Sequence, residues 1–167
     1  MKRRSSIARI AWIALALTLP LAGACSDANV AGNYTVAITN RADGCSIGWN
    51  SGDQATATFN VMQSGSDVTL SVSGLASIFV AAQFGTSTFT GDVSGDELDL
   101  RVTGTLPKED GSCMFTFNGK VSATQDGDTM SGRVEYRAAT NGHADCGSRE
   151  GCLSVQEFNA TRPPPAE

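Results

Sequence analysis

A β-hairpin pattern recurs three times along this chain. Residues 89–102 read FTGDVSGDELDLRV, residues 117–134 repeat this pattern with insertions, and residues 59–72 form a more divergent copy. After a short turn that contains Gly, apolar and polar side chains alternate, as they do from Leu98 to Leu100. This alternation is typical of an antiparallel strand with one face on a core and the other in water. Repeated hairpins without helical segments between them predict an all-β meander.

The strand pattern predicts one domain over residues 32–162, with eight antiparallel strands in up-and-down order. The tight turns then lie at one end of the sheet, at residues 64–66, 94–96 and 125–128. The long connections lie at the other end, at residues 41–53, 74–85, 105–112 and 138–151. Within them, residues 75–84 fit either a helix or a short strand. With this order the first and last strands are antiparallel and can pair, which closes the sheet into a barrel without exposed edges. A β-sandwich is the alternative.

The N-terminal segment is typical of an export signal. Residues 1–24 combine four basic side chains with an apolar run that is too short to span a bilayer. Small residues then precede Cys25, so the segment resembles a bacterial lipoprotein precursor, in which the Cys receives a lipid. That motif usually has Leu three places before the Cys, whereas this chain has Ala22, and the sequence Ala-Gly-Ala also suits ordinary signal peptidase.

The resemblance implies a lipid at Cys25, a tether over residues 25–31, and anchoring to a membrane of the bacterial cell envelope. A soluble periplasmic or secreted protein is the alternative. Residues 163–167 contain three consecutive Pro, which cannot join a strand ladder, and are expected to form a disordered tail.

The chain has five cysteines, an odd number. If Cys25 carries a lipid, four remain that can form disulfides in an oxidising compartment. The up-and-down order brings all four to the end with the long connections, and it favours the pairs Cys45–Cys152 and Cys113–Cys146. A Cys146–Cys152 bridge with a Cys45–Cys113 bridge is the alternative. Because no two cysteines have C-x-x-C spacing, the sequence favours disulfides over a metal site.

Charge narrows the choice of partners. Removal of residues 1–24 leaves 8 basic and 17 acidic side chains, a net charge of −9. An acidic chain without a basic patch argues against nucleic acid as a partner. It also predicts that contact with a lipid bilayer is made through the N-terminal lipid rather than through protein charge. The other expected partners are a small apolar ligand or an envelope protein.

The predicted first strand opens with Gly32-Asn33-Tyr34. In this Gly-x-aromatic start, and in the short turns at one end, the chain is similar to the calycin barrels, the lipocalins and avidins. In several of them a basic residue after the last strand packs over that aromatic ring, and Arg162 is the candidate here. The family's aromatic residue is Trp rather than Tyr, and the other lipocalin motifs and the avidin biotin-site tryptophans are absent. The resemblance therefore implies a barrel over residues 32–162 and no particular ligand.

Residues suited to catalysis are scarce. His143, the only His, lies beside Asp145 in a long loop without a positioned acid–base partner. The aspartates near the tight turns lack the spacing of a calcium loop, and turn formation explains them better. We therefore expect no enzymatic activity, no cofactor and no metal.

The predicted function is non-catalytic binding of a small apolar or amphipathic ligand, since a closed eight-stranded barrel has room for one. Three inward glycines, Gly91, Gly119 and Gly132, either leave a cavity or allow the strands to bend and pack closely. The candidate ligand-binding residues are Tyr34, Trp49, Phe79, Phe89, Phe117, Met130 and Tyr136. The alternative is a protein-interaction or inhibitor module that uses the rim formed by the long connections.

Overall fold

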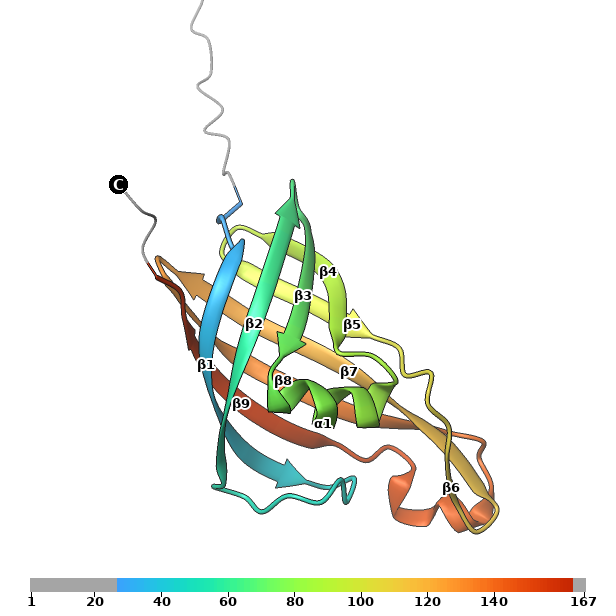
Figure 1. Ribbon diagram of the computed structural model, residues 1–167. Helices are drawn as coiled ribbons and strands as arrows, with labels where there is room; N and C mark the ends of the chain where they lie inside the picture. Colours follow the sequence, from blue (N-terminus) through green and yellow to red (C-terminus); the bar gives the residue numbers. More distant parts are fainter. Residues whose placement is uncertain (1–26, 164–167) are drawn as a thin grey trace, which may run out of the picture.

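The computed structural model describes residues 27–163, which form a closed eight-stranded antiparallel barrel with one extra strand (Figure 1). The strands are β1 (Gly32–Asp43), β2 (Gln54–Ser64), β3 (Asp67–Ser73), β4 (Thr88–Ser94), β5 (Glu97–Val102), β6 (Lys108–Asp110), β7 (Cys113–Asp126), β8 (Thr129–Thr140) and β9 (Ser154–Thr161). The helices are α1 (Leu75–Phe84) and the 3-10 helix η1 (Ala144–Arg149). The predicted export signal and Cys25 lie outside the described residues.

Each barrel strand pairs with its neighbours in the chain, apart from β6. Strand β5 pairs directly with β7, and β6 pairs only with the first residues of β7, beyond the end of β5. The barrel closes between β1 and β9, with Thr35 opposite Thr161 and Asn40 opposite Gln156. The predicted all-β meander and its closure are therefore confirmed, and the β-sandwich alternative is wrong.

Alternation along the strands produces the core. In β3, Val68, Leu70 and Val72 are buried, while the residues between them are partly exposed. The same pattern holds in β5 and along most of β7. Side chains from all eight barrel strands meet in one continuous cluster, so the inward positions expected from period-two alternation form the interior.

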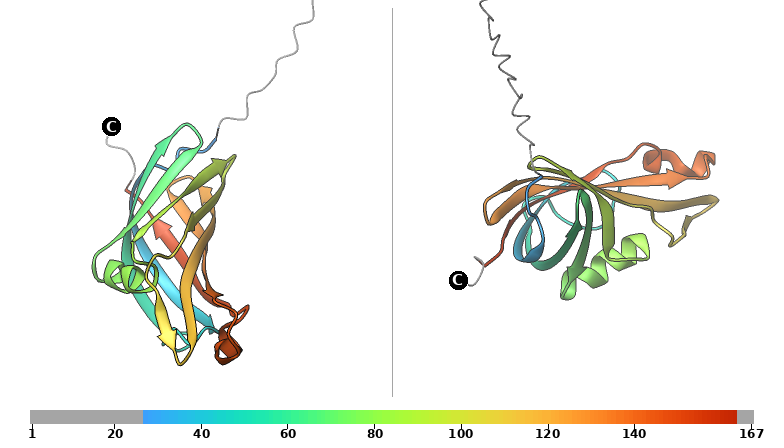
Figure 2. Two further views of the ribbon diagram at one scale, coloured as in Figure 1. Left: turned by 90° about the vertical axis from the view of Figure 1, so that its right-hand side faces the viewer. Right: turned by 90° about the horizontal axis from the view of Figure 1, so that it is seen from above.

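The two ends of the barrel differ, as predicted. At one end, here called the turn end, Gly65, Gly95 and Gly127 adopt positive φ in the tight turns that join β2–β3, β4–β5 and β7–β8. The opposite end, the loop end, carries the β1–β2 connection, α1, β6 and η1 (Figures 1 and 2). Residue 27 enters at the turn end, away from α1 and η1.

Both disulfides lie at the loop end and have the favoured pairing. Cys45 is bonded to Cys152, and Cys113 is bonded to Cys146. The first joins the connection after β1 to the residues before β9, and the second fixes η1 to the start of β7. Two disulfides are typical of proteins that mature in an oxidising, exported compartment.

The connections contain more regular structure than the sequence pattern indicates. Residues 75–84 form the helix α1, which ends at Gly85 in the left-handed conformation. Strand β1 continues to Asp43 and β8 to Thr140, where loops were expected. The short strand β6 and the helix η1 also lie in segments predicted as loops. Strand β6 forms because β7 extends beyond β5 and offers it a free edge, and η1 is held by a disulfide.

The inward glycines allow close packing. A Cβ at Gly119 would lie 2.7 Å from Cζ of Phe84, so this glycine makes room for the last side chain of α1. At Gly91 and Gly132 a Cβ would meet carbonyl oxygens of the neighbouring strands, at 2.1 and 2.4 Å. Of the two interpretations of these glycines, the structure favours close approach of strands and rings.

The turn end is closed by contacts of Tyr34 and Arg162. The Arg162 guanidinium lies 5.7 Å from the centre of the Tyr34 ring, as the calycin resemblance implies. It also donates a hydrogen bond to the carbonyl of Ala31 (2.6 Å) and pairs with Asp128 (3.1 Å). Arg162 thus joins the segment before β1, the end of β9 and the β7–β8 turn. Burial raises the pKa of the Tyr34 hydroxyl, and the charge of Arg162 acts in the opposite direction.

Residues 27–31 belong to the predicted tether, yet they pack across the turn end. The Gly95 amide donates to the Asp27 carboxylate (3.0 Å), and the Val30 amide donates to the side chain of Gln63 (2.7 Å). Val30 is fully buried. This segment therefore covers the turn end of the barrel.

We predict that Arg162→Ala lowers the free energy of unfolding by about 1–3 kcal/mol, because it removes charged hydrogen bonds to partly buried partners and the contact with the buried Tyr34 ring. Urea titration followed by circular dichroism measures the change. The control is Arg101→Ala, whose side chain is 72% exposed in a surface pair with Asp99 and is expected to cost about 0–1 kcal/mol. Equal losses in the two variants would contradict the role of Arg162.

Candidate ligand-binding cavity

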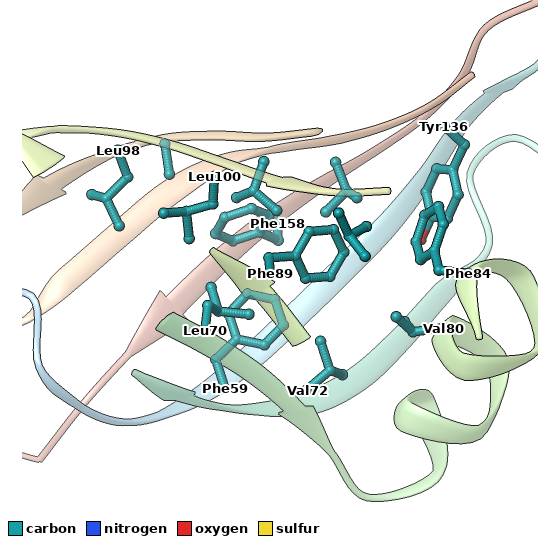
Figure 3. Close-up of a cluster of buried hydrophobic side chains, with 14 of the residues drawn as sticks. Phe59, Leu70, Val72, Val80, Phe84, Phe89, Leu98, Leu100, Tyr136 and Phe158 are labelled. Carbon is teal, nitrogen blue, oxygen red and sulfur yellow. The ribbon is translucent and has the colours of Figure 1, made fainter. Parts of the chain in front are cut away.

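The barrel encloses a cavity of about 370 Å³ in its loop-end half, next to α1. Its walls are mainly apolar and aromatic side chains from β1 to β4, β7, β8 and α1. Figure 3 shows some of them within the buried cluster, among them Phe59, Leu70 and Phe89. The lining residues are Ile38, Asn40, Gly48, Trp49, Asp53, Gln54, Ala55, Phe59, Leu70, Val72, Ala76, Phe79, Val80, Phe89, Val121, Val134, Tyr136 and Gln156. This size and composition fall in the range of small-molecule sites.

Helix α1 covers one side of the cavity. Val80 and Phe84 project from it toward the strands, and the Phe84 ring stacks on Tyr136 with centroids 5.1 Å apart (Figure 3). The helix ends are set by Gly74 and Gly85, both with positive φ. At its C-terminal end the Lys108 ammonium donates to the carbonyl of Ala82 (3.1 Å). The helix is therefore held by its buried aromatic residue and by contacts at its last turn.

Three aromatic rings lie at the mouth of the cavity and directly beneath it. Trp49 lies 5.3 Å from Tyr136 and 6.0 Å from Phe79, measured between ring centroids, and Phe79 lies 6.5 Å from Tyr136. Tyr136 is buried, whereas Trp49 and Phe79 are only partly buried. A ligand that enters the cavity would pass these two partly exposed rings.

The carboxylate of Asp43 holds the loop that carries Trp49. It accepts hydrogen bonds from the amides of Ile47 (2.8 Å), Gly48 (2.9 Å) and Trp49 (3.4 Å). The Ser154 hydroxyl also donates to it (2.8 Å), which connects the loop to β9. Burial acts to raise the pKa of Asp43, but these hydrogen bonds outweigh burial and the pKa lies below its ordinary value.

A strip of neutral polar groups runs along one wall. The Tyr136 hydroxyl donates to Oε1 of Gln156 (2.7 Å), and Nε2 of Gln156 donates to Oδ1 of Asn40 (2.7 Å). The backbone amide of Asn40 donates to the backbone carbonyl of Asp53 at the mouth (2.9 Å). Burial raises the pKa of the Tyr136 hydroxyl, so it remains a hydrogen-bond donor. The strip offers a polar head group fixed partners inside an otherwise apolar space.

The structure brings four of the seven candidate ligand-binding residues to the cavity: Trp49, Phe79, Phe89 and Tyr136. The other three lie elsewhere. Tyr34 and Met130 are buried at the turn end, and Phe117 packs against Phe115 near β6. These three were expected at a ligand site because they point inward. Tyr34 and Met130 lie in the other half of the barrel, and Phe117 lies at the loop end but outside the cavity lining. Ligand binding by the four lining residues stays a prediction.

The polar residues of the cavity are not among the candidates predicted from the sequence. Gln156 occupies an inward position of β9 between Ser154 and Phe158, so a polar side chain in an inward register was the available signal. Asn40 had the same signal, since it continues the inward alternation of Val36 and Ile38 in β1. Asp53 had no comparable signal, because it lies in a connection whose path cannot be derived from alternation.

The other candidate groups lie outside the cavity. A larger hollow of about 700 Å³ on the outer face of β4, β5 and β7–β9 is lined by exposed polar side chains, among them the pair Asp99–Lys120 (2.9 Å). His143 accepts a hydrogen bond from the Asp145 amide at the start of η1, which gives it a structural role. Within residues 27–163, no three His, Cys, Asp or Glu side chains gather as a metal site would require. The helices of this same region are too short or too polar to span a bilayer.

The closed barrel, its turn end and the Arg162–Tyr34 contact fit a calycin-like barrel. No protein-family model and no curated protein matches the chain. One solved structure, described as EF1p2_mFAP2b bound to DFHBI, is similar over 80% of this chain and 93% of its own, with 12% sequence identity and a TM-score of 0.45. A similarity this distant carries no information about the ligand.

We predict that Asp43→Ala loosens the loop at the mouth and shifts Trp49 emission to longer wavelength. Trp49 is the only Trp among residues 27–163, so it reports this loop. Because the folded pKa of Asp43 is lowered, its contribution to stability is present above the unfolded value of about 4 and is lost as the pH falls through the folded pKa.

Acid titration of Trp49 emission tests this prediction. The parent protein is expected to show a red shift at low pH, while Asp43→Ala starts red-shifted at neutral pH. The control is Asp67→Ala, an exposed residue at the turn end. Identical emission of Asp43→Ala and the parent at neutral pH would show that the carboxylate does not hold the loop.

Proposed function

We propose that this protein is an exported, lipid-anchored protein of the bacterial cell envelope whose barrel binds a small apolar or amphipathic ligand without catalysis. The observation that carries the proposal is the cavity of about 370 Å³, with apolar walls, a neutral polar strip and an aromatic mouth. Apolar walls with a few convergent polar groups are the usual composition of a small-molecule site.

The geometry suits a ligand with two parts. Phe59, Leu70 and Phe89 lie deep in the barrel and would contact the apolar body. The polar strip of Asn40, Gln156 and Tyr136 would hold a hydrogen-bonding head group. Burial of the apolar body contributes about 25 cal/mol per Å² of area removed from water, and the polar strip adds orientation.

The proposed anchor is consistent with the position of the first described residues. Asp27 is held at the turn end, so a lipid on Cys25 would attach the barrel by that end. The loop end and the cavity mouth would then face away from the anchoring membrane. The two disulfides support passage through an oxidising compartment.

A second candidate function is protein interaction through the loop end. Four large apolar side chains are exposed there: Leu75 (85%), Ile78 (68%), Met114 (48%) and Leu106 (42%). Leu75 and Ile78 lie on the outer face of α1, away from the cavity. An inhibitor or assembly factor would use such residues, and their substitution by Ser would then reduce partner binding without changing ligand affinity.

We predict that Val134→Phe lowers ligand affinity by roughly tenfold or more, because the added ring occupies the cavity. The neutral dye N-phenyl-1-naphthylamine, which fluoresces in apolar sites, serves as the probe. The control is Thr58→Phe, which adds a ring on the outer face of β2. Dye binding that is unchanged in Val134→Phe, with an unaltered unfolding temperature, would place the ligand elsewhere.

We predict that the full-length chain, produced in a bacterium, is cleaved before Cys25 and gains the mass of a lipid. Cys25→Ser is expected to lose that mass and to leave the detergent phase on Triton X-114 partition. Mass spectrometry of the intact protein and of its N-terminal peptide measures both effects. An unmodified Cys25 at the mature N-terminus would contradict anchoring and favour the soluble alternative.

A further inference from the structure

The charge of the cavity lining is one-sided. Among the described residues that line it, Asp53 alone is charged, and no Lys, Arg or His is present. Asp53 lies at the mouth, where its carboxylate is exposed and accepts a hydrogen bond from the Asn50 side chain (3.2 Å). A ligand that enters the cavity therefore meets negative charge and no positive charge.

The basic residues of the loop end are engaged away from the cavity. Arg41 pairs with Glu157 on the outer face of the barrel (2.8 Å). Arg149 donates to the carbonyl of Cys45 (2.9 Å) and lies over the Phe115 ring. Lys108 donates to the last turn of α1. An anionic head group would thus find no cationic partner in the lining, and its desolvation would be uncompensated.

The aromatic mouth favours a cation. The rings of Trp49 and Phe79 are partly exposed there, with centroids 6.0 Å apart. Aromatic faces attract ammonium groups that come within about 6 Å of the ring centre, and Trp does so most strongly. The carboxylate of Asp53 belongs to the same cavity lining.

We propose that the cavity selects a cationic amphiphile, with an amine on an apolar body, over an anionic one of the same shape. The ammonium group lies at the mouth between Asp53 and the aromatic rings, and the apolar body fills the space between Phe59, Leu70 and Phe89. This selectivity presupposes the binding function proposed above, and it adds the sign of the ligand's charge.

The experiment compares three probes with ten carbon atoms each: 4-phenylbutylamine, 4-phenyl-1-butanol and 4-phenylbutyrate. The exported chain is titrated with each probe while Trp49 emission is recorded. If the chain carries a lipid, it is first bound to phosphatidylcholine vesicles. The excitation wavelength is longer than those at which the phenyl group absorbs. An exposed ion pair changes an affinity by roughly two- to fivefold. The dissociation constant of the amine is therefore expected to be about tenfold lower than that of the carboxylate, with the alcohol between them.

Two variants separate charge from shape. In Asp53→Asn the amine and the carboxylate are expected to approach the affinity of the alcohol, whose own affinity stays unchanged. Asp67→Asn removes an equivalent charge at the turn end and is expected to keep the parent's preference. The preference of the parent should also decrease in 0.5 M salt, where charges are screened over about 4 Å. Equal unfolding temperatures of the variants exclude a folding defect.

The outcomes distinguish the two proposals. Equal binding of all three probes, or tighter binding of the carboxylate, would overturn the charge selection and leave the binding function intact. A preference for the amine that persists in Asp53→Asn would overturn the role of Asp53. No change in Trp49 emission and no displacement of the neutral dye by any probe would overturn both proposals.

Discussion

The pairing of β1 with β9 is the contact on which the rest of the architecture depends. It joins the two ends of the meander, so that every barrel strand has a partner on both sides and no long edge is exposed. An even number of barrel strands makes β1 and β9 antiparallel, as this pairing requires. Because consecutive barrel strands run in opposite directions, the connections alternate between the two ends. The tight turns gather at one end, and the connections that contain α1, β6 and η1 gather at the other.

Closure alone leaves the interior to be filled, and the two halves are filled differently. In the turn-end half, Tyr34 and Met130 are buried, and Arg162 lies over the Tyr34 ring. In the loop-end half, α1 lies over the strands and inserts Phe84 above Gly119. The aromatic contacts of Phe84 and Tyr136 keep the helix against the barrel, while the space beyond them stays open as the cavity.

Much of the barrel follows from period-two alternation, because each strand buries one face and each Gly-containing turn reverses the chain. The disulfide pairing follows from the same order, since it brings Cys45 to Cys152 and Cys113 to Cys146. The helical state of residues 75–84 depends instead on tertiary contacts, chiefly the space above Gly119. Asp53 lies in the candidate site because of the path of a connection, which no local pattern encodes. Phe117 and Tyr34 point inward, as alternation predicts, but alternation does not define which part of the interior stays open.

The ends of the barrel domain lie next to each other. Arg162 donates to the carbonyl of Ala31, and Thr161 lies opposite Thr35 in the ladder. A linker that crossed the turn end from residue 163 to residue 27 would therefore disturb no strand, and the chain could be opened instead at an exposed loop such as residues 50–53. Such a circular permutant would keep the same barrel and move both chain ends to the rim of the cavity.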